Sequence, residues 1–199
     1  AWAKEKGEED SHLLYEPDIE INKDTFKIQL AGGEPFMIKK FARMLSEIEN
    51  TDCDIVVNTN ATIVTKPLFD QLKRFKNVWI VVSIDGFGKL NEKIRRGSTW
   101  SLVEKHIDLF IESGFHVLVN TVLQKDNVNT LSELGRFLES KGIDDWIISP
   151  MFTPAELQWH TNENVNFDDV ETTLNMHAVQ RNENSKTLLE HVLKEKNKS

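Results

Sequence analysis

Five short apolar segments alternate with helical patterns along most of this chain, and that alternation restricts the fold more than any other feature. The apolar segments are residues 26–31, 54–60, 78–85, 116–124 and 145–151. Helical patterns follow the first four of them, at residues 35–50, 66–75, 99–114 and 130–142. Strands joined by helices favour a parallel sheet with right-handed crossovers. We therefore expect an α/β fold, either a partial or full α/β barrel or a flat doubly wound sheet.

Local signals mark several helix ends. Pro67 lies in a first helical turn, where its missing N–H costs little, and Thr65 before it predicts an N-cap. Gly114 and Gly142 are placed to end two helices. After Pro154 an Asn-rich loop precedes two further expected helices, residues 167–180 and 186–196, and no strand follows.

This pattern divides the chain into three parts. We expect an N-terminal helix or linker remnant over residues 1–25, a βα region over residues 26–154, and a helical C-terminal extension over residues 155–199. The opening segment "AWAKEKGEED" reads like the middle of a helix. We therefore expect the chain to be a fragment or to be shortened at its N-terminus.

Composition is that of an ordinary globular protein and narrows the expected partners. The chain is 39% hydrophobic and 28% charged, with a formal net charge of −8. Nucleic-acid backbones are bound by clustered Lys and Arg, so this balance argues against a nucleic-acid partner. No run of about 18 apolar residues occurs, so we expect no membrane span. We expect a cytoplasmic location.

Cysteine and histidine usage limits the metal chemistry that this chain can support. Cys53 is the only cysteine, which excludes an internal disulfide and a multi-cysteine iron–sulfur site built from this chain alone. We expect Cys53 to be a small apolar packing residue. The six histidines show no metal-ligand spacing, so we predict no metal ligands in this sequence.

Polar residues gather where the expected strands end. In parallel sheets, ligands bind beyond the carboxyl ends of the strands. The candidates for a small-molecule site are Gly32, Gly33, Glu34, Pro35, Asn58, Asn60, Ser83, Asp85, Asn120 and Ser149. Taken singly, each has a structural interpretation: Asn60, for example, is typical of a turn. Taken together, they predict a binding site at one edge of the sheet.

The segment Gly32–Pro35 is the sharpest of these signals. Glycine lets a ligand lie against bare backbone, and Glu34 supplies an anion suited to an ammonium group. Pro35 is well placed to begin the following helix. A phosphate loop fits less well, because no Lys-Ser/Thr follows the glycines and a carboxylate repels phosphate.

Three motifs in this order resemble those of radical S-adenosylmethionine (SAM) enzymes. "LAGGEPFM" resembles the GGEP segment of that family, and "VVNTNATIVT" resembles its "TTNGTLLT" strand end, with Ala61 where glycine is usual. "SIDGFGKLNEKIRRG" resembles its "SIDG…IR…G" block. The resemblance covers roughly residues 26–151. It is strongest to the branch of sulfatase- and peptide-maturing enzymes with a twitch or SPASM segment, and "WAKE" with "AGGEPF" is similar to phage-borne members.

The resemblance implies a partial (α/β)6 TIM-like barrel whose strand ends bind SAM. It implies that the GGEP backbone and Glu34 hold the methionyl amino group. Ser83 and Arg95 would contact the carboxylate and ribose, with Asp85 beside them. Asn120 and residues 148–150, which include Ser149, would lie near the ribose and adenine.

The resemblance also implies an enzyme that carries a [4Fe–4S] cluster on a C-x₃-C-x₂-C loop and generates a 5′-deoxyadenosyl radical. Its substrate would be a peptide, a protein or a small molecule, and its reductant a flavodoxin or ferredoxin. This chain has no such loop, and the sequence identifies no catalytic residue. We expect the loop to lie upstream of Ala1, which would leave this chain inactive by itself. The alternatives are a degenerate, non-catalytic binding or scaffold protein, or an unrelated α/β ligand-binding domain with a chance GGEP.

Overall fold

The five predicted strands form one parallel sheet. The computed structural model describes residues 25–196 and places the strands in the order β1-β2-β3-β4-β5. Their bounds are β1 Lys27–Leu30, β2 Asp54–Thr59, β3 Val78–Ser83, β4 His116–Leu123 and β5 Trp146–Pro150. In a doubly wound sheet the strand order reverses direction, whereas here each strand is added on the same side of the one before it. This order confirms the α/β prediction and favours the barrel-like arrangement.

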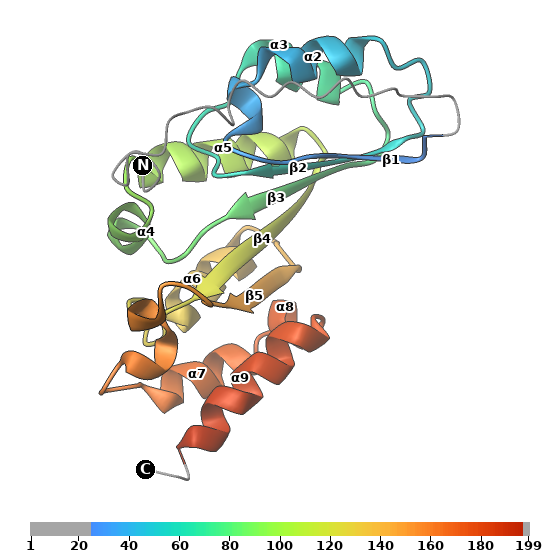
Figure 1. Ribbon diagram of the computed structural model, residues 1–199. Helices are drawn as coiled ribbons and strands as arrows, with labels where there is room; N and C mark the ends of the chain where they lie inside the picture. Colours follow the sequence, from blue (N-terminus) through green and yellow to red (C-terminus); the bar gives the residue numbers. More distant parts are fainter. Residues whose placement is uncertain (1–24, 197–199) are drawn as a thin grey trace.

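The helices connect successive strands and extend the fold beyond the last one. They are α2 Lys39–Ser46, α3 Lys66–Leu72, α4 Lys89–Ile94, α5 Trp100–Glu112, α6 Leu131–Ser140, α7 Phe167–Leu174, α8 His177–Gln180 and α9 Glu183–Glu195, with short 3-10 turns η2 Pro35–Met37, η3 Ala155–Leu157 and η4 Trp159–Thr161. Figure 1 shows α2 and α3 side by side at the β1–β2 end of the sheet and α7 to α9 at the β5 end. None of the helices in this part of the chain has the length and apolar character needed to cross a bilayer.

Several helix limits differ from the sequence expectations. The predicted helix 167–180 is two helices, because Met176 adopts an extended backbone (ψ 141°) and begins α8. Helix α9 begins at Glu183 rather than residue 186, since the Asn182 side chain caps it by accepting from Ser185 N. Thr65 precedes α3 as predicted, but its hydroxyl donates to Phe36 O at 2.7 Å instead of capping the helix. Helix α4 was not predicted, and the helix expected in residues 1–10 lies outside the described residues.

The two faces of the sheet have different environments. Alternate residues on the helix-covered face are fully buried, such as Ile55, Ile80 and Val119. The opposite face, called the inner face here, carries the partly exposed alternates Val56, Asn58, Trp79, Val81, Ser83, Leu118, Asn120, Val122, Ile147 and Ser149. The strand period of two therefore assigns each polar strand residue to one face.

Helix α9 closes the free edge of β5. A sixth strand of a barrel would pair with the outward backbone groups of Trp146 and Ile148. Instead, Ile148 N donates to Ser185 Oγ at 2.7 Å, and the same Oγ lies 3.3 Å from Trp146 O. Ser185 is completely buried in this position. The Ser185 hydroxyl thus accepts from a strand-edge N–H that would otherwise be buried without an acceptor, while its single proton can go to Trp146 O or to Asn182 Oδ1, 3.0 Å away.

Replacing Ser185 with alanine should destabilise the protein. The change leaves the Ile148 N–H buried without an acceptor, which costs about 1–3 kcal/mol. Chemical denaturation followed by circular dichroism measures this loss. Ser140→Ala is the matched control, because within residues 25–196 the Ser140 hydroxyl bonds only to Phe137 O of its own helix. Equal effects of the two substitutions would contradict the proposed edge closure.

Candidate functional site

The candidate residues converge on the carboxyl edge of the sheet. The Gly32–Pro35 segment follows β1, Asn58 and Asn60 lie at the end of β2, and Ser83 and Asp85 lie at the end of β3. Asn120 on β4 is the register partner of Ser83, and Ser149 on β5 is the partner of Val122. The five parallel strands therefore bring these residues to one edge of the sheet.

The two glycines make a turn that other residues adopt poorly. Gly32 and Gly33 have φ of 92° and 53°, in the left-handed region that favours glycine. A Cβ built on Gly32 would meet no heavy atom within 4 Å. Conformation, rather than crowding, therefore requires glycine here, and the turn leaves its backbone open to a ligand.

Glu34 fastens this turn to the end of β2. Its Oε1 accepts from Thr59 Oγ1 at 2.7 Å and from Phe36 N at 3.3 Å, and its Oε2 accepts from Asn60 N at 2.9 Å. The residue is only 8% exposed, and no described Lys or Arg pairs with it. Because a carboxylate offers about four acceptor positions, one remains on Oε2. Glu34 is therefore a buried anion stabilised by neutral donors.

Thr59 contacts the candidate residue Glu34 and was not among the residues predicted from the sequence. It lies between Asn58 and Asn60, and the strand period turns it to the covered face, where it bonds to Glu34. Asn60 reaches Glu34 through its backbone, while its side chain accepts from Thr62 N at 2.9 Å and closes a turn. The strand period was the available signal for Thr59, since it separates the face of residue 59 from that of its neighbours.

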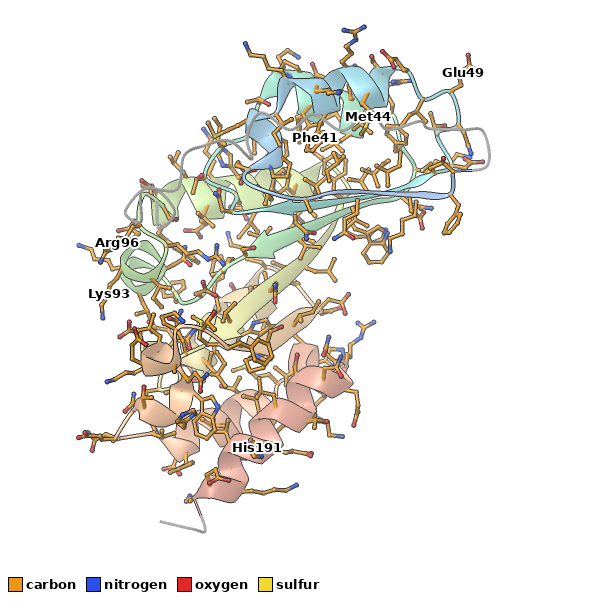
Figure 2. The ribbon with its side chains drawn as sticks, viewed as in Figure 1. Phe41, Met44, Glu49, Lys93, Arg96 and His191 are labelled. Atoms are coloured by element: carbon orange, nitrogen blue, oxygen red, sulfur yellow. The ribbon has the colours of Figure 1, made fainter. Side chains whose placement is uncertain are left out.

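Asp85 and Arg95 form a second anchored group at the same edge. Arg95 Nε lies 2.8 Å from Asp85 Oδ2, while Asp85 Oδ1 accepts from Val122 N at 2.8 Å. Asp85 is 5% exposed, whereas the Arg95 side chain keeps 28% of its surface accessible. Figure 2 shows two neighbours of Arg95 extending away from the sheet: Lys93 on α4 and Arg96 just after this helix. Asp85 thus holds the Arg95 guanidinium at the ends of β3 and β4.

Asn127 supports this group from behind and was also missed. It is fully buried, and its Nδ2 donates to Asp85 O at 2.9 Å and to Val122 O at 2.8 Å. Its Oδ1 accepts from Gln124 N at 2.9 Å. Asparagine in a loop after a strand is a common turn signal, but the sequence does not show that this one joins two strand ends.

The inner face carries two polar atoms without partners. Asn58 Oδ1 and Asn120 Oδ1 are buried and make no hydrogen bond within residues 25–196. A buried acceptor left unpaired is costly and rare in native proteins. Ser83 and Ser149 lie on the same face. A ligand that donates hydrogen bonds would satisfy these asparagines.

Cys53 lies at the opposite edge of the sheet, just before β2, and is 1% exposed. Burial, and secondarily the neighbouring Asp54 charge, raises the pKa of its thiol above the ordinary value. No group of three His, Cys, Asp or Glu side chains arranged to hold a metal occurs among residues 25–196. The residues present therefore do not fit a [4Fe–4S] cluster.

Asn127→Ala should lower the free energy of unfolding by about 1–3 kcal/mol or more, because the Asp85 and Val122 carbonyls and the Gln124 N–H would stay buried without their hydrogen-bond partner. Thermal and chemical unfolding measure the loss. Asn129→Ala serves as the control, since the Asn129 side chain makes exposed contacts to the 164–166 loop. A loss no larger than that of the control would refute the anchoring role.

Cys53 should resist thiol reagents in the folded protein. Its burial blocks access, and its raised pKa leaves little thiolate at neutral pH. Titration with a chromogenic disulfide such as DTNB should label it slowly in the native state, faster as pH rises, and rapidly in denaturant. Rapid native labelling at neutral pH would contradict its assignment as a packing residue.

Comparison with known proteins agrees with the motifs. Residues 17–138 match the model of the Radical SAM superfamily. The chain is 26% identical over 155 residues to Molybdenum cofactor biosynthesis protein 1 of Drosophila melanogaster, covering 76% of this chain and 27% of that protein. It is 26% identical over 158 residues to GTP 3′,8-cyclase of Staphylococcus epidermidis, covering 76% of this chain and 46% of the relative.

Solved structures share the fold. Streptococcus suis SuiB superimposes with a TM-score of 0.55 at 21% identity, over 74% of this chain and 34% of that one. Native anSMEcpe with bound AdoMet and Kp18Cys peptide superimposes with a TM-score of 0.54 at 16% identity, over 74% of this chain and 44% of that one. The chain thus spans less than half the length of these relatives. Because the family model covers more than half of the chain, this protein belongs to the radical SAM superfamily.

Proposed function

We propose that the carboxyl edge of the sheet binds S-adenosylmethionine and that the chain is part of a radical SAM enzyme of the twitch or SPASM-containing branch. The observation that carries this proposal is the pair of unpartnered acceptors, Asn58 Oδ1 and Asn120 Oδ1, on the inner face beside an anchored guanidinium. SAM carries ribose hydroxyls and an adenine amino group, which are the donors that such acceptors require.

The two charged groups suit the amino-acid end of SAM. Glu34 is a buried carboxylate with no cationic partner among the described residues and one acceptor position remaining, so an ammonium group would stabilise it. The open backbone of Gly32 and Gly33 adds carbonyl acceptors beside it. Arg95 keeps its Nη1 and Nη2 donors outside any hydrogen bond within residues 25–196 and can receive the carboxylate.

The role of these residues is to bind and orient SAM. Asn58, Ser83, Asn120 and Ser149 line the nucleoside half, while Glu34 and Arg95 flank the methionyl half. A [4Fe–4S] cluster supplies the electron for radical generation in this family, and the residues of this chain do not hold one. We propose that its three cysteine ligands and its reductant contacts lie in a segment outside this sequence.

The substrate class follows only from relatives. SuiB has been solved bound to precursor peptide SuiA, and anSMEcpe with the Kp18Cys peptide, which support a peptide or protein substrate. GTP 3′,8-cyclase instead acts on a nucleotide, as its name states. We propose a peptide or protein as the substrate class, with a small molecule as the alternative.

A second candidate is a non-catalytic SAM-binding protein that has lost its cluster. The observation behind it is that this sequence contains one cysteine, Cys53, which is buried. The two are separated by the reading frame immediately upstream of Ala1. Three cysteines spaced C-x₃-C-x₂-C, with iron–sulfur absorbance after anaerobic reconstitution of the longer protein, would support the enzyme.

Two ligands that need no cluster test the binding site. S-adenosylhomocysteine carries the nucleoside and the amino-acid end, whereas 5′-methylthioadenosine carries the nucleoside alone. Asn120→Ala should weaken the binding of both ligands by about 2- to 12-fold, because it removes a neutral hydrogen bond. Arg95→Gln should weaken the binding of S-adenosylhomocysteine by about tenfold or more and leave the affinity for 5′-methylthioadenosine unchanged, because only S-adenosylhomocysteine has a carboxylate.

Calorimetry and saturation-transfer NMR measure these affinities, and the NMR experiment detects millimolar binding. Arg43→Gln is the matched control, because Arg43 pairs with Glu47 on the exposed side of α2. Absence of saturable binding of either ligand to the unmodified protein, or equal effects of Arg95→Gln on both ligands, would overturn the proposed site.

A further inference from the structure

His106 contacts the ligand edge from the helical layer behind the sheet. It lies in the middle of α5, and its Nδ1 is 2.7 Å from Ala61 O. A carbonyl oxygen only accepts hydrogen bonds, so Nδ1 must carry a proton and donate. An imidazole on an outer helix thus binds the backbone one residue beyond Asn60, whose N–H donates to Glu34.

The residue that His106 holds has an unusual conformation. Ala61 has φ of 54°, is completely buried, and is the non-glycine residue with positive φ among residues 25–196. This region costs an alanine roughly 1–2 kcal/mol, because its Cβ crowds the following carbonyl. Hydrogen bonds hold both sides of the residue: Ala61 N donates to Thr59 Oγ1 at 3.0 Å, and Ala61 O accepts from His106. The strained backbone is therefore kept in place by two side chains.

These contacts continue to the buried carboxylate. Thr59 Oγ1, which accepts from Ala61 N, donates to Glu34 Oε1. Asn60 N, in the residue before Ala61, donates to Glu34 Oε2. Ala61 N therefore helps to fix the Thr59 hydroxyl that donates to Glu34, and the Ala61 backbone follows directly after the residue whose N–H is the second donor. Glu34 in turn sets the position of the Gly32–Gly33 turn.

We propose that His106 is a positioning residue for the ligand site, acting through Ala61 on the two donors that hold Glu34. The proposal rests on the proposed SAM site for its effect on binding, but its effect on Glu34 stands independently. A glycine at position 61 would adopt the left-handed conformation without strain. In this chain alanine occupies it, and His106 supplies the added constraint.

The position of the bonded nitrogen gives a specific test. The side-chain amide nitrogen of asparagine replaces histidine Nδ1, whereas that of glutamine replaces Nε2. His106→Asn should therefore keep the hydrogen bond to Ala61 O, and His106→Gln should lose it. The side chain lines a surface groove between α3 and α5, together with Lys73 and Lys105, so neither change leaves a closed cavity.

Two measurements on these variants separate the proposals. The amide proton shift and hydrogen-exchange rate of Asn60 report its bond to Glu34 without any ligand, and the affinity for S-adenosylhomocysteine reports the site. His106→Gln should change the amide proton shift of Asn60 and speed its hydrogen exchange. It should also weaken the binding of S-adenosylhomocysteine by about 2- to 12-fold. His106→Asn should resemble the unmodified protein in its Asn60 amide signal and in its affinity for S-adenosylhomocysteine. Lys105→Gln, in the same groove, should change neither of these two quantities.

Each failure has a distinct meaning. An unmoved Asn60 amide in His106→Gln, or equal effects of the Asn and Gln variants, would overturn the positioning role. A shifted amide in a protein that binds no S-adenosylhomocysteine would refute the proposed function and leave the positioning role intact. Thermal unfolding of each variant confirms that the comparison is made on folded protein.

Discussion

The Glu34 carboxylate is the interaction on which the candidate site depends. It accepts from Thr59 Oγ1, Asn60 N and Phe36 N, and so joins the turn after β1 to the end of β2. Asp85 plays the same part between β3 and β4, because it follows β3 and its Oδ1 accepts from Val122 N of β4. In both cases a buried acid satisfies backbone donors where the ladder between parallel strands ends. The same atoms therefore stabilise the sheet and shape the edge at which the candidate residues gather.

The two acids differ in how their charge is balanced. Asp85 has the Arg95 guanidinium at 2.8 Å, whereas Glu34 has only neutral donors among the described residues. A buried charge without a counter-ion is tolerated when hydrogen bonds stabilise it, and a cationic ligand then gains from it. One end of the edge is suited to an ammonium group and the other to a carboxylate. This asymmetry matches a zwitterionic amino-acid head better than a phosphate.

The β5 edge of the sheet is covered by the C-terminal helices. A barrel would continue with a strand beside β5, and an open edge there would expose pairing groups. Ser185 of α9 satisfies Ile148 N and approaches Trp146 O, while α7 and α9 contact each other and α9 packs on β5. The C-terminal helices therefore cover the β5 edge of the sheet. Asn58 and Asn120 lie on strands away from that edge, on the inner face.

The sequence by itself determined the parallel α/β fold and the edge at which its candidate residues gather, because strand and helix periods and turn residues are local properties. It predicted Glu34, Asp85 and Asn120 as candidate site residues, since each follows or lies in an apolar segment, whereas Arg95 was implied only by the resemblance of its segment to a family motif. Only the tertiary structure decided what these side chains contact. The strand period gives the face of Thr59 but not its partner. The contacts of Thr59, Asn127, His106 and Ser185 that matter here are with residues 25 to 45 positions away in the chain. Their hydrogen bonds exist only once strand register and helix packing bring those distant segments together.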